Sequence, residues 1–132
     1  MSRHLTPMLA DLRRLLMADA AVMSAAPGGI DWAEHPQDVA HGTYVVLTLI
    51  DAGEGLTQGG PDALLTARVQ VDCYALALLG AAQAATTVAS VLDGYRNGAF
   101  ALIRSAGSRS LREDGDPVLH RVSSDYIINY GG

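Results

Sequence analysis

Residues 65–75, LTARVQVDCYA, decide the fold of this chain. Apolar or small side chains occupy every second position, and polar or aromatic side chains occupy the positions between them. The two sets are Leu65, Ala67, Val69, Val71 and Cys73, and Thr66, Arg68, Gln70, Asp72 and Tyr74. Because successive side chains on a strand point to opposite faces, this alternation predicts a strand with one face in the core and one polar face.

A second strand is predicted before it, at residues 44–50, YVVLTLI. This β-branched and apolar run is typical of a strand that is covered on both sides, and another subunit can be one of the covers. The connection, residues 51–61, has the sequence DAGEGLTQGGP with four glycines. Glycine-rich segments hold regular structure poorly, so we expect an exposed loop between the two strands.

A helix is predicted after Gly80, where the hydrophobic period becomes helical, and Asn97-Gly98 should end it. Its apolar side carries Val88, Val91, Leu92 and Tyr95. Five alanines between residues 81 and 89 let this helix lie close to a sheet.

The last third of the chain predicts two further strands with a polar loop between them. Residues 100–104 form the first strand, and residues 105–117, SAGSRSLREDGDP, form the loop. The last strand carries Val118, Val122, Tyr126 and Ile128 on one face.

The N-terminal part predicts a helix that begins at Thr6-Pro7, where the threonine hydroxyl can cap free amides. Its apolar side carries Leu5, Leu9, Leu12 and Leu16. Asp19 should cap a short further turn through Met23, and residues 27–42 should be loop. The order α-β-β-α-β-β predicts one α+β domain over residues 1–132, a mainly antiparallel sheet with two main helices packed on it.

Composition excludes several functions. The net charge is −5 and the nine cations are all arginine, which disfavours direct DNA binding and excludes lysine Schiff-base chemistry and a Walker-type phosphate loop. Cys73 is the only cysteine, so an internal disulfide and a zinc site with two or four cysteines are impossible. The charge-free run from Cys73 to Leu92 is alanine-rich and lacks basic flanks, so we expect no membrane span. Charged residues at positions 11, 13, 14 and 19 interrupt what would be the apolar core of a signal peptide, so we expect a cytosolic start.

No motif predicts a catalytic, cofactor or metal site. Gly53-Glu54-Gly55 lacks the spacing of a dinucleotide loop, and His35 and His41 have irregular spacing and no strong further ligand. The serines at 105, 108 and 110 lack a nucleophile turn, and the two aspartates at 114 and 116 lack the glutamate that a calcium loop needs. His120 shares the apolar face of the last strand, which favours a core or interface histidine over a catalytic base.

Charged residues repeat at a separation of four on two strands. Arg68 and Asp72 share one strand face, and Arg121 and Asp125 repeat the arrangement on the last strand. The pattern predicts cross-strand ion pairs, within one subunit or between two, and an unpaired solvated face fits it equally well.

Five stretches in their order make this chain resemble the tail-completion, or tail terminator, proteins of long-tailed phages and gene transfer agents. They are LRRLLMADAAV from Leu12, YVVLTLI from Tyr44, ARVQVDCYA from Ala67, VLDGYRNG from Val91 and LHRVSSDY from Leu119. Threonine occupies position 43, where such proteins often have proline.

The resemblance implies a structural virion protein, made in the bacterial cytoplasm, without catalytic residues or cofactor. It implies a homo-hexameric ring that contacts the tail tube protein and a head-side connector or stopper protein, with DNA passing through unbound. A head-side connector or stopper of the same particle is the alternative, and a small enzyme is a more distant one. We further hypothesise that acidic residues line the bore, since basic walls would retain DNA.

Docking is expected in the two long loops, 51–61 and 105–117, because glycine-rich and polar segments form adaptable contact surfaces. Replacing residues 53–60 by a short Gly-Ser turn should leave the fold intact and stop assembly. The candidate docking and ring-contact residues are Asp51, Glu54, Leu56, Gln58, Arg68, Asp72, Arg109, Arg112, Arg121 and Asp125.

Overall fold

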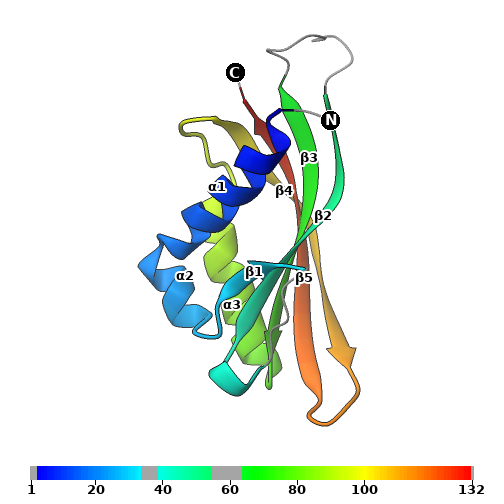
Figure 1. Ribbon diagram of the computed structural model, residues 1–132. Coiled ribbons are helices and arrows are strands. Elements are labelled where there is room, and N and C mark those ends of the chain that lie inside the picture. The colour runs from blue at the N-terminus through cyan, green and yellow to red at the C-terminus, as the bar shows by residue number, and fades with distance from the viewer. Residues whose placement is uncertain (1–2, 34–38, 55–63, 132) are drawn as a thin grey trace.

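The computed structural model describes residues 3–33, 39–54 and 64–131 (Figure 1). The helices are α1 (Leu5–Met17), α2 (Ala20–Ala25) and α3 (Leu78–Leu92), with a short 3-10 turn, η1 (Val39–His41). The strands are β1 (Ile30–Trp32), β2 (Tyr44–Glu54), β3 (Leu65–Ala75), β4 (Phe100–Glu113) and β5 (Leu119–Tyr130). They form one sheet in the order β1-β2-β3-β5-β4, in which β1 is parallel to β2 and the other pairs are antiparallel. The predicted α+β class is confirmed.

The three helices pack on one face of the sheet, which we call the helix-covered face (Figure 1). The alternation of β3 is confirmed, because its odd-numbered side chains are buried beneath the helices. Ala81 and Ala84 are buried as well, so the alanines of α3 do bring that helix close to the strands. The opposite side, the open face, carries the even-numbered residues of β3 and their neighbours on β2, β5 and β4.

Both N-terminal helices are confirmed, but α2 extends to Ala25 instead of Met23, and Leu5 and Leu9 of α1 are only partly buried. The helix begins at Leu5, and no side chain caps it, so the predicted capping by Thr6 is wrong. Met8, Leu12 and Leu16 are its buried side chains. α2 follows with the predicted cap: the Asp19 carboxylate accepts a hydrogen bond from the Val22 amide at 3.0 Å.

We expect Asp19→Ala to lower the free energy of unfolding by about 1 kcal/mol, because it leaves an amide of the first turn of α2 without its acceptor. Urea denaturation measures the change. Thr6→Ala is the matched control: this exposed residue caps nothing, so its loss should be near zero. Equal losses in the two variants would contradict the assignment of the cap.

The largest correction concerns β4. The strand does not stop at Arg104 but continues through residues 105–113, where a loop was predicted, and only residues 114–118 connect it to β5. These residues are nearly all exposed, so they carry no hydrophobic alternation. They are in a strand because β5 pairs with them from Ser105 to Glu113, across a register shift between Ser105 and Ser108.

Three smaller predictions are also corrected. Residues 27–42 contain β1, which pairs with Val45–Leu47 of β2. Residues 51–54 belong to β2 and pair with β3 beyond a bulge next to Leu49, whereas residues 55–61 lie outside the described residues. α3 ends at Leu92, so Tyr95 follows the helix. β2 was expected to be covered on both sides, and the helices of this chain cover one of them. That another subunit covers the other side stays a prediction.

In the described ranges, no helix is long and apolar enough to cross a membrane. The charge-free run from Cys73 to Leu92 is divided between the end of β3 and α3.

Candidate functional site

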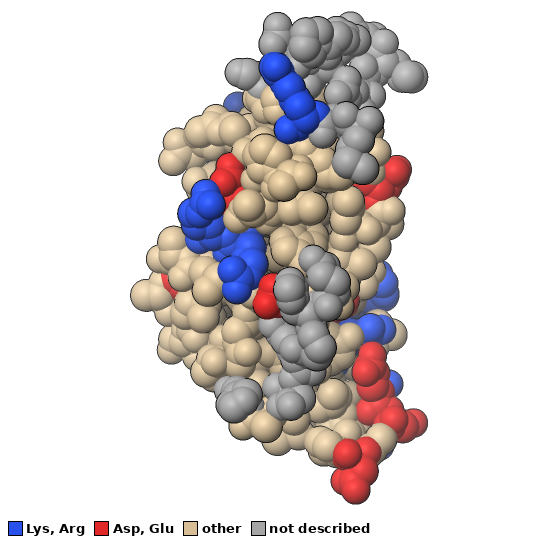
Figure 2. All heavy atoms as spheres, in the orientation of Figure 1, with Lys and Arg blue, Asp and Glu red and all other residues tan. Residues whose placement is uncertain are grey.

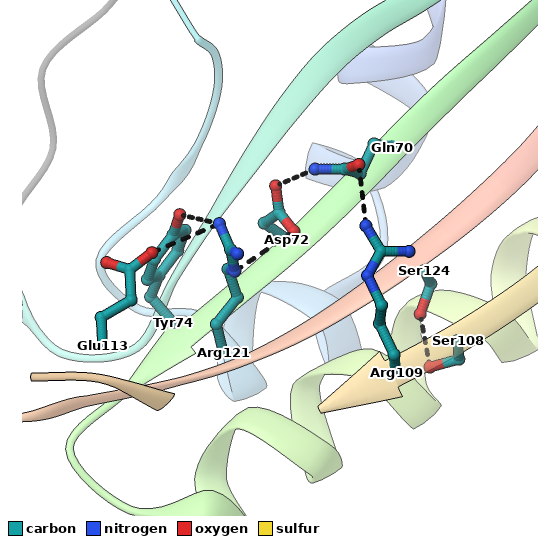
Figure 3. A network of polar contacts seen from close by, with 8 residues as sticks. All are labelled: Gln70, Asp72, Tyr74, Ser108, Arg109, Glu113, Arg121 and Ser124. Atoms are coloured by element: carbon teal, nitrogen blue, oxygen red, sulfur yellow. Dashed lines mark hydrogen bonds and ion pairs between the residues drawn. The ribbon is translucent and has the colours of Figure 1, made fainter. Parts of the chain in front are cut away.

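A group of polar side chains from three strands, β3, β5 and β4, lies side by side on the open face (Figure 3). β3 lies at the centre, between β2 and β5, and β4 lies beyond β5. The pairing register places Asp72 opposite Ser123 and Arg109 opposite the same serine on the far side. Residues that are distant in sequence therefore share one surface.

Arg121 is the centre of this network (Figure 3). Its Nη1 donates to the Tyr74 hydroxyl at 3.2 Å and lies 3.3 Å from Glu113 Oε1, while its Nε lies 3.9 Å from Asp72 Oδ1. The guanidinium carbon lies 5.8 Å from the centre of the Tyr74 ring, which stacks on Tyr44 with the ring centres 5.0 Å apart. One arginine thus connects β5 to both β3 and β4 on this face.

Three further contacts extend the network along β3. Arg68 binds Asp125 Oδ2 through Nη2 at 2.7 Å and through Nε at 3.1 Å. The Gln70 amide nitrogen donates to Asp72 Oδ2 at 2.8 Å, and its oxygen accepts a long bond from Arg109 at 3.4 Å.

Part of the network is buried although no helix covers it. Asp72 is 3% exposed and Ser123 is fully buried, since the long side chains around them exclude solvent. Asp72 Oδ1, Ser123 Oγ, Asp125 Oδ1 and Arg121 Nε have no hydrogen-bond partner within the described chain. Two of these atoms, Asp72 Oδ1 and Arg121 Nε, lie 3.9 Å apart and form an ion pair without a hydrogen bond. Buried polar atoms without a hydrogen bond are costly, so the ion pair matters for stability.

Burial and charge shift two pKa values here. Burial raises the pKa of the Tyr74 hydroxyl, although the hydrogen bond from Arg121 opposes this. Burial alone would lower the pKa of Arg121, but the contact with Tyr74 and the two carboxylates Asp72 and Glu113 raise it above its ordinary value. The tyrosine is therefore held neutral and the arginine charged, so neither is suited to act as a base.

The network fits a contact surface better than a reaction centre. Three arginines, at 68, 109 and 121, are matched by three carboxylates, Asp72, Glu113 and Asp125, so the formal charges cancel. Among the described residues, no group of three or more His, Cys, Asp or Glu side chains is placed to hold a metal ion. Cys73 is free and buried on the helix-covered face, where burial and the nearby Asp72 charge raise its pKa to about 12.

The predicted cross-strand ion pairs are confirmed within one chain. Arg68 pairs with Asp125 and Arg121 with Asp72, each joining β3 to β5. Arg109 joins the same network through Gln70.

The other candidate residues lie apart from this network. Arg112 pairs with Asp114 at 3.1 Å near the turn between β4 and β5, where Figure 2 shows acidic side chains gathered at the bottom of the molecule. Asp51 is exposed at the edge of the open face. Glu54 ends β2 and its side chain is not described, and Leu56 and Gln58 lie outside the described residues, as do His35 and the side chain of His41. His120 is half-buried on β5.

The candidate residues chosen from the sequence do not include four members of the network, namely Gln70, Tyr74, Glu113 and Ser123. The alternation of residues 65–75 places the first two on the same face as Arg68 and Asp72, so that signal was present. Glu113 had no such signal, because its position depends on the unexpected length of β4.

These features define the class: a small α+β domain with a five-stranded sheet, helices on one face and a charge-balanced polar network on the other. The family model described as "Tail completion protein gp17" matches residues 10–131. The chain therefore belongs to this family of tail completion proteins, which confirms the resemblance seen in the sequence. A search of curated proteins gives no match.

A solved structure described as "Virion of native gene transfer agent (GTA) particle" contains a chain with the same fold. The TM-score is 0.69, the sequences are 19% identical, and the likeness covers 92% of each chain. At this identity the likeness shows the fold alone.

Proposed function

We propose that this protein is a structural component of a phage or gene transfer agent particle, where six copies form a ring that ends the tail tube and joins it to the head. The family match over residues 10–131 carries the proposal. The solved relative with this fold is part of a gene transfer agent virion, which agrees with a place in such a particle.

The geometry of the chain supports a structural role. The residues of the polar network bind each other, and their side-chain atoms that lack a hydrogen bond are buried beneath the surrounding side chains. Tail tube protein on one side and a head-side connector or stopper protein on the other are the expected partners. DNA would pass through the ring without specific contacts, and an acidic lining of the bore stays a prediction.

The test uses a bacterial strain that produces the particles. The gene for this protein is deleted in that strain and supplied again from a plasmid. We expect the deletion to give tails of uncontrolled length or tails without heads, and the plasmid to restore normal particles. Cryo-electron microscopy of the restored particles should show six copies of this fold at the head-proximal end of the tail. Normal particles from the deletion strain, or a density without six-fold symmetry, would refute the proposal.

Binding experiments separate the tail terminator from the alternative head-side connector. The terminator should retain tube protein in a pulldown, whereas a connector or stopper should retain the portal instead.

A further inference from the structure

Five large apolar side chains are exposed among the described residues, and three of them lie together. These three are Leu76, Leu78 and Leu79, which are 59%, 48% and 68% exposed. Leu76 follows the end of β3, and the other two are the first residues of α3. Exposed apolar side chains that lie together mark interaction surfaces. We call these three residues the leucine patch.

The leucine patch has an acidic border. β3 ends at Ala75 opposite His120, and β4 ends at Glu113, so the β4–β5 turn lies at the same end of the molecule as the patch (Figure 1). Residues 112–116, REDGD, contain one arginine and three carboxylates, so their formal charge is −2. Asp116 is exposed and makes no ion pair with any described residue. A surface that covers the patch should therefore be apolar with positive charge at its margin.

A groove between α1 and β1 has an apolar lining. Leu9, Ala10, Met17 and Trp32 line it, and Met17 is itself 39% exposed. The Trp32 indole donates a hydrogen bond to the Leu9 carbonyl at 3.0 Å, which fixes the ring in the wall of the groove. A fixed aromatic ring beside a flexible methionine suits the packing of aliphatic side chains from another surface. We call this hollow the α1–β1 groove.

Two arginines, Arg13 and Arg14, line the same groove. The Arg14 side chain is 75% exposed, although its Nη1 bonds Asp11 at 2.7 Å. Arg13 is 39% exposed, and its Nε donates to the Ile30 carbonyl at 2.9 Å. A guanidinium has five N–H donors, so both arginines retain donors for a further carboxylate. The groove thus has the apolar lining and the positive margin that the leucine patch calls for.

We propose that the leucine patch of one copy packs into the α1–β1 groove of the next copy, with the acidic β4–β5 turn beside Arg13 and Arg14. The inference rests on the ring proposed above and names the surfaces that join its subunits. A second copy is favoured over the tail tube protein as the occupant of the groove, because this chain itself carries both halves of the contact.

The placement of the two surfaces allows a ring to close. β1 and β4 are the opposite edges of the sheet, so the groove beside β1 and the acidic turn after β4 lie on different sides of the chain. Each copy can therefore bind one neighbour through its groove and another through its leucine patch. Contacts between unlike surfaces of this kind generate closed rings.

Photo-crosslinking in assembled particles tests the contact. Leu79 is replaced by p-benzoylphenylalanine, and irradiation should give a ladder of linked copies of this chain on a denaturing gel. Mass spectrometry should place the links in residues 9–18 or at Trp32, because these residues form the groove. The same probe in place of Ser90 is the matched control. Ser90 is exposed near the other end of α3, so it should give no ladder.

Two substitutions test the apolar part of the contact. Met17→Asp and Leu79→Asp, supplied from the plasmid in the deletion strain, should each lower the particle yield about tenfold or more, because each places a carboxylate in an apolar contact. Ile50→Asp changes an apolar residue that is 50% exposed and lies outside both surfaces, so the yield should stay near that of the unchanged protein. Urea denaturation of the three purified variants establishes that each is folded.

The outcomes separate this inference from the proposed function. Six-fold particles in which position 79 links to another protein, or to a part of this chain outside the groove, would overturn the packing and leave the ring intact. Links to the groove in particles without six-fold symmetry would support the packing and overturn the ring. Normal particles with no link between copies, or a full yield from folded Met17→Asp, would also contradict the contact.

Discussion

Arg121→Met is expected to lower the free energy of unfolding by about 3 kcal/mol, because it removes the one cation that pairs with the buried carboxylate of Asp72 among the described residues. The methionine retains most of the apolar stem, so the loss reports the charge more than the packing. The Tyr74 hydroxyl and Glu113 lose their contacts with the guanidinium in the same variant. Urea denaturation with linear extrapolation measures the difference.

The same β4–β5 hairpin offers a matched control. Arg112 also pairs with a carboxylate, Asp114, but both side chains are largely exposed. Arg112→Met should therefore cost less than about 1 kcal/mol. The double variant Arg121→Met/Asp72→Asn should recover part of the loss, since it also removes the negative charge of Asp72 that the single variant leaves unpaired. If Arg121→Met costs no more than Arg112→Met, the buried ion pair does not stabilise the fold.

Alkaline pH is expected to remove several kcal/mol of stability between about pH 9 and pH 12. Burial raises the pKa of Cys73 from 9.0 to about 12, with a contribution from Asp72, and burial raises the pKa of Tyr126 from 10.0 to about 12. Both groups are fully buried and neutral in the native state, whereas the unfolded chain ionises them at their ordinary pKa values. Each unit of difference corresponds to about 1.4 kcal/mol, so the stability present below pH 9 is lost as the pH rises through this window.

Urea denaturation from pH 8 to pH 12 measures this loss. Tyr126→Phe should flatten the decline above pH 10, and Cys73→Ala should flatten it from pH 9. NMR of tyrosine labelled with ¹³C at the ζ position, assigned with Tyr126→Phe, follows the hydroxyl directly. Ionisation of Tyr126 near pH 10 in the folded protein would contradict the prediction.

Local patterns in the sequence determined the class of fold and part of the candidate site. The alternation of residues 65–75 defines a strand and both of its faces, because it depends only on the geometry of one strand. The separation of four between Arg68 and Asp72, and between Arg121 and Asp125, puts opposite charges on one face of each strand. Ion pairs across strands follow from that spacing once the strands are neighbours.

Only the tertiary structure decided which strands are neighbours. Arg68 meets Asp125 because β5 inserts between β3 and β4, an order that no local pattern contains. Residues 105–113 are polar and exposed, so their strand conformation comes from backbone pairing with β5 and not from side-chain burial. β1 is three residues long and exists through its pairing with β2. β1 and the second half of β4 form because their backbones hydrogen-bond to distant segments. Such backbone bonding produces no periodic pattern of side chains, so the sequence does not reveal these strands.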